Sequence, residues 1–227
     1  MQKLYAYLCI FYVFASLNFI YSEESVDRLI AKKVNTNPRY NMTVSDTKKF
    51  IWFRVAKVGT RSIYEVLANN NTEISLDDYS LAFNPKQYKG YFKFAFVRNP
   101  WDRVVSCYFN KVVGQAGRAY KECFGKDFEY FVGFIERQDL LKADIHIRLQ
   151  TALIPRKDVN FIGRMENFNE DLIYILRTLH LTHIDIPHKN LSGHQHYSKY
   201  YTERTRKIIA KKYKEDIAAF KYRFEEQ

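Results

Sequence analysis

The stretch that decides the fold is FIWFRVAKVGTRS, residues 50–62. Residues 50–56 are rich in aromatic and β-branched side chains and predict a buried strand. Residues 57–61 predict a tight loop, and Ser62 lies near the expected start of a helix that reaches Leu67. A loop between a parallel strand and a helix directs backbone N–H groups and the positive end of the helix dipole toward one point. The stretch therefore predicts an anion-binding turn in an α/β fold.

The side chains of this loop match that interpretation. Gly59 lets the backbone approach a phosphate, Thr60 and Ser62 add hydroxyl donors, and Lys57 and Arg61 add positive charge. The alternative is a generic strand–helix turn with a helix cap. The loop is not the nucleoside-triphosphate loop G-x-x-x-x-G-K-[ST], because its lysine precedes its glycine. A kinase of the P-loop type is therefore a poor second choice among enzymes.

A second segment of the same kind follows at residues 91–106. Residues 91–97 predict a strand that ends at Arg98-Asn-Pro100, and Pro100 suits the first turn of a helix running to about Val113. Arg98 leaves the end of the strand, and Ser106 lies two turns along the helix. A bidentate guanidinium and a hydroxyl suit a second, separate phosphate group.

The rest of the chain continues the alternation of strands and helices. Helices are expected over 128–136, 140–153, 168–179 and 201–220, and a third strand over 159–163. This alternation predicts an α/β domain in which helices cover both faces of a parallel sheet. Cys107 and Cys123 form one disulfide or remain free buried thiols.

Together, the two motifs resemble the family-2, carbohydrate-type sulfotransferases, which are related to the heparan and chondroitin sulfotransferases. Residues 144–150, 161–167 and 197–224 extend the resemblance over most of the chain. One departure is Leu149, where the family pattern has a proline before the glutamine. The resemblance implies a P-loop-like three-layer fold with a central parallel sheet flanked by helices. It also implies that the co-substrate is 3′-phosphoadenosine 5′-phosphosulfate (PAPS), with its 5′-phosphosulfate held by Lys57, Val58, Gly59, Thr60, Arg61 and Ser62 and its 3′-phosphate by Arg98 and Ser106.

The expected reaction moves a sulfuryl group from PAPS to a hydroxyl of a carbohydrate, with an acidic glycan among the candidate acceptors and without a metal. Lys57 is the natural partner of the bridging oxygen, where charge grows. His146 is the first choice for the general base, because imidazole has a suitable pKa. Glu166 and His188 are alternatives, and Glu73, Asp77 and Asp78 are weaker candidates.

The formal net charge of +11 favours anionic partners. The sequence contains no zinc-finger spacing, recognition-helix motif or basic run interleaved with stacking aromatics, so no nucleic-acid partner is expected. A catalytically inactive, basic glycan-binding protein is the alternative from a different class. Such a protein would not need Lys57, Arg98 and Ser106 together.

The N-terminal residues from Leu4 to Ile20 carry no charge; Lys3 precedes them and acidic residues follow. Residues 1–22 are therefore expected to be a signal peptide or a signal anchor, with a buried first helix as the structural alternative. Residues 23–49 are expected to form a stem, and 50–227 the sulfotransferase domain. With the sequons at Asn41, Asn70 and Asn190, this predicts a lumenal domain on a short stem. The resemblance to the family implies that the compartment is the Golgi, with a single-pass membrane protein as the expectation. The alternative is a secreted or periplasmic domain after cleavage near Ser22.

Overall fold

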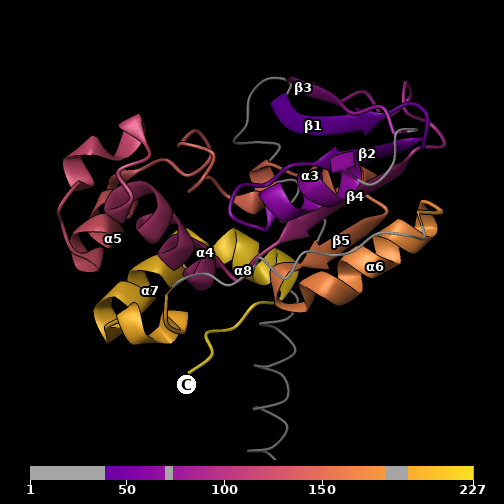
Figure 1. The fold of residues 1–227 in the computed structure, drawn as a ribbon. Helices are drawn as coiled ribbons and strands as arrows, with labels where there is room; N and C mark the ends of the chain where they lie inside the picture. Colours follow the sequence, from indigo (N-terminus) through magenta and orange to yellow (C-terminus); the bar gives the residue numbers. More distant parts are fainter. Residues whose placement is uncertain (1–38, 70–73, 182–193, 227) are drawn as a thin grey trace, which may run out of the picture.

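The structure is a computed structural model, and it describes residues 39–69, 74–181 and 194–226. Within these residues a five-stranded sheet has the order β3-β1-β2-β4-β5 (Figure 1). β2, β4 and β5 are parallel, whereas β1 is antiparallel to both β2 and β3. The α/β fold is confirmed, but the sheet is mixed rather than wholly parallel. The strands are β1 (Arg39–Ser45), β2 (Phe50–Phe53), β3 (Asp77–Ala82), β4 (Phe92–Val97) and β5 (Phe161–Arg164).

The central strands are buried on both faces. All four residues of β2 and the last four of β4 have no exposed surface. Because consecutive residues of a strand point to opposite faces, both faces of the sheet must be covered. Trp52 lies opposite Phe94 in the register, and their rings stack with centroids 6.3 Å apart. Helices α3 (Thr60–Asn69) and α6 (Phe168–Thr178) add apolar side chains to the same core, among them Ile63, Val66, Leu172 and Ile175.

The first strand, β1, corrects the predicted domain boundary. Its seven residues fall inside the stretch 23–49 that the sequence assigns to a stem, yet Met42 and Val44 are buried in the sheet core. Thr43 is buried as well, and its hydroxyl is satisfied there, since it donates to a carboxylate oxygen of Asp78 on β3 at 2.7 Å. Because polar residues alternate with apolar ones in this strand, its composition does not predict a buried strand. The stem prediction is therefore wrong for residues 39–49.

Three helices form a lobe beside the carboxyl ends of the parallel strands (Figure 1). α4 (Pro100–Cys107) follows β4 directly and continues as a π-helix over Tyr108–Val113. α5 (Phe128–Arg137) and α7 (Glu203–Lys212) pack with α4 around a second hydrophobic core. Trp101, Val105, Tyr120, Phe131 and Ile209 lie in this core. The lobe fixes the position of α4 relative to the sheet.

Two predicted helices differ from the observed structure. Residues 140–153 form turns and a short 3₁₀-helix over Gln150–Ala152 instead of one helix. The predicted tail helix, 201–220, is two helices, α7 and α8 (Lys214–Phe220). They separate at Tyr213, whose buried hydroxyl donates to the carbonyl of Ile147 at 2.7 Å. This contact joins residues far apart in the sequence, so helical periodicity does not report it.

The lead Leu4–Ile20 and the sequons at Asn70 and Asn190 lie outside the described residues. The helices that the structure does describe include none long and apolar enough to cross a membrane. The third sequon asparagine, Asn41, belongs to β1. Cys107 and Cys123 are both buried and free, so of the two predicted alternatives the structure shows free thiols rather than a disulfide.

Candidate active site

The loop after β2 is a tight turn with two residues in the left-handed region. Lys57 has φ +74° and Gly59 has φ +75°. The Val58 side chain between them is fully buried, and the Thr60 hydroxyl donates to the carbonyl of Val55 at 2.8 Å. The N–H of Ile63 then bonds the carbonyl of Gly59 at 3.0 Å as α3 begins. A non-glycine residue rarely adopts positive φ, and such strain is concentrated at functional sites.

Gly59 is required for packing as well as for its backbone conformation. A Cβ at this position would lie 2.7 Å from a ring carbon of Phe168, the first residue of α6, and 3.3 Å from the sulfur of Met165. Any side chain would therefore push the loop away from α6. The prediction explained Gly59 by close approach to a phosphate, whereas the structure shows a close approach to an aromatic ring.

The side chain of Lys57 lies in a partly buried, positively charged environment. Burial lowers its pKa to about 8, and the charges of Arg98, Lys111 and Arg61 act in the same direction, while Cys107 opposes them. Lys111 was not predicted as a site residue; it belongs to the π-helix that extends α4. The charges of Arg98, Lys111 and Arg61 thus all act on Lys57 beside the loop. This concentration of positive charge is suited to a multiply charged anion.

Arg98 connects the two predicted phosphate segments. Its side chain is largely buried, and its guanidinium donates to both carboxylate oxygens of Asp102 at 2.7 and 2.9 Å. The remaining nitrogen, Nη1, donates to the carbonyl of Lys57 at 3.3 Å. The loop after β2 and the segment after β4 are therefore in direct contact. Ser106 is half-buried on α4, one turn beyond Asp102, and so lies on the same face of the helix.

The backbone at Arg98 is held by a buried polar network. The side-chain amide of Gln150 accepts from the N–H of Arg98 and donates to its carbonyl, both at 2.9 Å. Asp216 of α8 accepts from the N–H groups of Gln150 and Thr151, both at 2.9 Å, and from the Thr151 hydroxyl at 3.0 Å. Both Gln150 and Asp216 are fully buried. Burial raises the pKa of Asp216, and its hydrogen bonds oppose that shift.

The departure at Leu149 has a structural counterpart. Its φ of −53° would suit a proline, but its N–H donates to the carbonyl of Leu140 at 3.0 Å. A proline lacks this donor. In this chain leucine thus keeps the extended conformation and adds a hydrogen bond within the segment 140–149.

His146 is paired with a carboxylate. Its Nδ1 lies 2.6 Å from Oδ1 of Asp144, and the same oxygen accepts from the Tyr120 hydroxyl at 2.6 Å. Hydrogen bonds from His146, the largest effect, and from Tyr120 hold the pKa of Asp144 well below its usual range, and burial opposes them. This is the arrangement in which a carboxylate orients an imidazole base. Asp144 precedes His146 by two residues, so D-x-H is the signal that could have found it.

A buried arginine joins His146 to the loop of Lys57. The guanidinium of Arg103, on α4, donates to the carbonyl of Ala56 at 3.0 Å and to that of Ile145 at 2.9 Å. Ala56 precedes Lys57 and Ile145 precedes His146. One guanidinium therefore bonds the two backbone segments that bear the predicted electrophile and the predicted base.

Glu166 has a different environment from that expected of a base. Its Oε1 accepts from the N–H of Asn99 at 2.6 Å, and its Oε2 accepts from the Tyr222 hydroxyl at 3.0 Å. Both oxygens thus tie the start of α4 to the C-terminal segment, and these contacts favour His146 as the base. Among the other candidates, Asp78 pairs with Arg54 at 2.7 Å. Glu73 and His188 lie outside the described residues.

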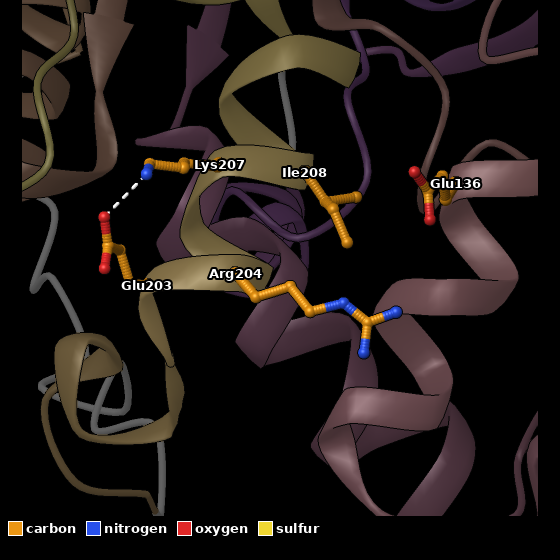
Figure 2. A pocket seen from close by; sticks show the side chains of 5 residues that line it. All are labelled: Glu136, Glu203, Arg204, Lys207 and Ile208. Carbon is orange, nitrogen blue, oxygen red and sulfur yellow. Dashed lines mark ion pairs between the residues drawn. The ribbon is translucent and has the colours of Figure 1, made fainter.

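Two hollows lie on the surface of the helical lobe. A cavity of about 260 Å³ adjoins the Arg98 site and is lined by Asp102 and Glu166, with Asn99, His194, Gln195, His196, Tyr197 and Glu225. A larger hollow of about 460 Å³ lies between α5 and α7 and is lined by Glu136, Glu203, Arg204, Lys207 and Ile208 (Figure 2). None of the predicted site residues lines the larger hollow, and Lys207 there pairs with Glu203 at 2.6 Å. Of the predicted site residues that the structure describes, Glu166 alone lines the smaller cavity, which also borders Asp102, the partner of Arg98.

Comparison with known proteins agrees with this geometry. The model of the sulfotransferase family, family 2, matches residues 40–223, a range that begins in β1 and contains both predicted motifs. Comparisons with curated proteins and with solved structures give no match. The match covers most of the chain, including the loop after β2, the arginine after β4 and the Asp144–His146 pair. The chain therefore belongs to the family-2 sulfotransferases.

Proposed function

We propose that this sulfotransferase takes its sulfuryl group from PAPS and transfers it to a hydroxyl of a carbohydrate. Membership of the family supports sulfuryl transfer. The observation that supports PAPS is the bond from Arg98 to the carbonyl of Lys57. It brings together two cationic segments, as a donor with separate 5′ and 3′ anionic groups requires.

The residues present fit such a donor. Backbone N–H groups of residues 58–62 lie at the start of α3, where the helix dipole favours an anion. Lys57, Arg61, Arg98 and Lys111 supply charge around them. In this assignment the loop binds the 5′-phosphosulfate, whereas Arg98 and Ser106 bind the 3′-phosphate. The Thr60 hydroxyl closes the loop onto Val55, so its contribution is to shape the turn.

The proposed chemistry uses Lys57 and His146. PAPS supplies an activated sulfuryl group. His146 accepts the proton of the acceptor hydroxyl as its oxygen forms the new bond to sulfur. Lys57, in its protonated form, stabilises the negative charge that the bridging oxygen gains as the old sulfur–oxygen bond breaks. The products are a sulfate ester and 3′-phosphoadenosine 5′-phosphate (PAP), and the sum of these steps conserves atoms and charge.

The acceptor assignment rests on the charge of the chain. A net charge of +11 favours association with an acidic glycan by long-range attraction. The test incubates the purified chain with radiolabelled PAPS and a panel of neutral and acidic glycans. We expect label in at least one glycan, and none in a protein or a nucleic acid added as control acceptors. Glycan binding without label transfer, at any PAPS concentration, would instead identify a catalytically inactive glycan-binding protein.

We further propose a lumenal Golgi location for the domain. The uncharged lead Leu4–Ile20 and the three sequons support it. The full chain is expressed in animal cells, treated with a glycosidase and extracted with carbonate. A glycosylated, carbonate-resistant product is expected from a membrane anchor, and a glycosylated soluble product from cleavage near Ser22. An unglycosylated cytosolic product would contradict the lumenal location.

A further inference from the structure

We propose that Asp144 and Tyr120 are positioning residues that fix the tautomer of His146. In this tautomer the proton is on Nδ1, and Nε2 is free to accept the proton of the acceptor hydroxyl. The inference deepens the proposed function and rests on it, because it concerns the base of the same reaction. It assigns a role to Tyr120, a residue 26 positions before His146 in the sequence.

The hydrogen bonds at Asp144 determine which ring nitrogen carries the proton. Its Oδ1 receives the N–H of His146 at 3.0 Å, the Tyr120 hydroxyl at 2.6 Å and Nδ1 of His146 at 2.6 Å. The same contacts keep the pKa of Asp144 low, so the carboxylate is ionised and can only accept hydrogen bonds. Nδ1 must then be the donor. In the neutral imidazole this leaves the lone pair on Nε2.

Tyr120 can act only as a donor in this arrangement. Its side chain is almost fully buried in the lobe core, where its ring lies 6.0 Å from Phe131 and 5.9 Å from Phe134. Burial raises its pKa far above the usual range, so the phenol stays protonated. The neighbouring Cys107 is also buried, and burial raises its pKa to about 12. Cys107 is therefore a neutral thiol beside the Tyr120 phenol, and the charged groups that act on it are Arg103, Lys57 and Asp144.

The backbone around His146 is held independently of Tyr120. Arg103 donates to the carbonyls of Ile145 and Arg148 at 2.9 and 2.8 Å, and the Tyr213 hydroxyl donates to the carbonyl of Ile147. Removal of the Tyr120 hydroxyl should therefore leave this segment in place. What changes is the orientation of the Asp144 carboxylate, and with it the preference of His146 for the Nδ1–H tautomer.

The test measures the tautomer directly. The full chain is labelled with nitrogen-15 histidine, and the ring-nitrogen chemical shifts of His146 are compared with those in Asp144→Ala and Tyr120→Phe, with His146→Gln used for assignment. Alanine is chosen because an asparagine would keep an acceptor oxygen at the place of Oδ1. The Nδ1–H tautomer should dominate in the wild type and lose its dominance in Asp144→Ala. Turnover should fall about a hundredfold in Asp144→Ala and about tenfold in Tyr120→Phe. PAP affinity should stay within about twofold in both, since neither residue is assigned to the donor site.

A matched control is Tyr130→Phe, because Tyr130 is 40% exposed on α5. It should change neither the shifts nor the rate. Retention of the Nδ1–H tautomer in Asp144→Ala would overturn the inference, as would equal losses of turnover and PAP affinity in Tyr120→Phe. Absence of sulfuryl transfer by the wild type is a separate failure, that of the proposed function. The nitrogen shifts still decide whether these two residues set the state of the imidazole.

Discussion

At the scale of single residues, Lys57 has both a strained backbone conformation and a lowered pKa. It adopts a left-handed conformation at the end of β2, and burial lowers its pKa to about 8. The positive charges of Arg98, Lys111 and Arg61 add to this effect. A lysine held in this way gains more from a nearby anion than an exposed lysine does, because less of its charge is already stabilised by water.

Binding of PAP should therefore be linked to proton uptake. Above about pH 8 the free Lys57 is mostly neutral, and the phosphates should raise its pKa, so the complex takes up a proton. Calorimetric titrations with PAP at about pH 8.5, in buffers of different ionisation enthalpy, should show uptake of up to about three quarters of a proton. At about pH 6.5 the uptake should vanish, because Lys57 is already protonated. The variant Lys57→Arg should show none at either pH, and unchanged uptake in that variant would assign the proton elsewhere.

Arg98 and Lys57 should differ in what they contribute. Arg98→Ala should weaken PAP binding about 10- to 100-fold, because charge-assisted hydrogen bonds to a phosphate are lost. The same substitution should weaken the binding of 5′-AMP much less, because 5′-AMP lacks the 3′-phosphate. Lys57→Ala should mainly slow the chemical step, since the charge it meets grows in the transition state. An equal loss of affinity for PAP and for 5′-AMP in Arg98→Ala would contradict the assignment of Arg98 to the 3′-phosphate.

One control separates lost contacts from new repulsion. Arg98→Ala leaves the carboxylate of Asp102 without the guanidinium that pairs with it at 2.7 Å. A free carboxylate would itself repel a phosphate. The double variant Arg98→Ala/Asp102→Ala removes this repulsion. Any PAP affinity that it regains over Arg98→Ala measures the repulsion by Asp102, and the remaining loss measures the contacts of Arg98.

At the scale of elements, α8 is linked to the end of β4 by hydrogen bonds of two side chains, Asp216 and Gln150. Asp216 of α8 fixes Gln150, and the Gln150 amide in turn bonds the N–H and the carbonyl of Arg98. The contact extends the hydrogen-bonding pattern of β4 beyond its last residue, Val97. The site geometry therefore depends on a helix near the other end of the chain.

Asp216→Asn should destabilise the fold. The asparagine amide places an NH₂ group where the carboxylate accepts from the N–H groups of Gln150 and Thr151, so at least one buried donor loses its acceptor. The free energy of unfolding should fall by about 1–3 kcal/mol, as measured by urea denaturation. The exposed Glu129→Gln on α5 serves as the control. An Asp216→Asn variant as stable as that control would show that the network contributes nothing.

The sequence predicts best those elements whose signal is local. Strand β2 is an unbroken apolar run, β4 is apolar except for Lys93, and Pro100 marks the start of α4. These elements and the charged loop that follows β2 can therefore be predicted from the residues themselves. β1 cannot, because its buried Thr43 is satisfied by Asp78 from a strand more than thirty positions later. Likewise, α7 and α8 separate at Tyr213, whose hydroxyl donates to the carbonyl of Ile147, a contact that no helical pattern contains. Lys111 and Tyr120 reach the site only through the packing of the lobe.

At the scale of the whole molecule, the site lies where two hydrophobic cores meet. The loop after β2 belongs to the sheet core, whereas α4 and Tyr120 belong to the lobe core. Figure 1 shows the lobe helices beside the carboxyl ends of the parallel strands. Arg103 connects the two parts through the carbonyls of Ala56 and Ile145. A sulfuryl donor that contacts both the loop and Arg98 would therefore form a further connection between the sheet and the lobe.

PAP should stabilise the whole fold. At a concentration one hundred times its Kd, a ligand that binds only the folded state adds about 2.7 kcal/mol to the free energy of unfolding. Urea denaturation with and without PAP measures this difference. The double variant Lys57→Ala/Arg98→Ala should show little of it at the same PAP concentration. Equal stabilisation of the double variant and the wild type would place PAP elsewhere on the protein.

The central claim is tested most directly by the balance of products in a single reaction. The wild-type chain is incubated with PAPS and a glycan acceptor from the panel, and mass spectrometry counts the PAP released and the sulfate gained by the glycan. We predict one sulfate on the glycan for each PAP, with the rate reduced about a hundredfold or more in His146→Ala. Release of PAP without sulfate on any glycan, or the full wild-type rate in Lys57→Ala, would contradict the account.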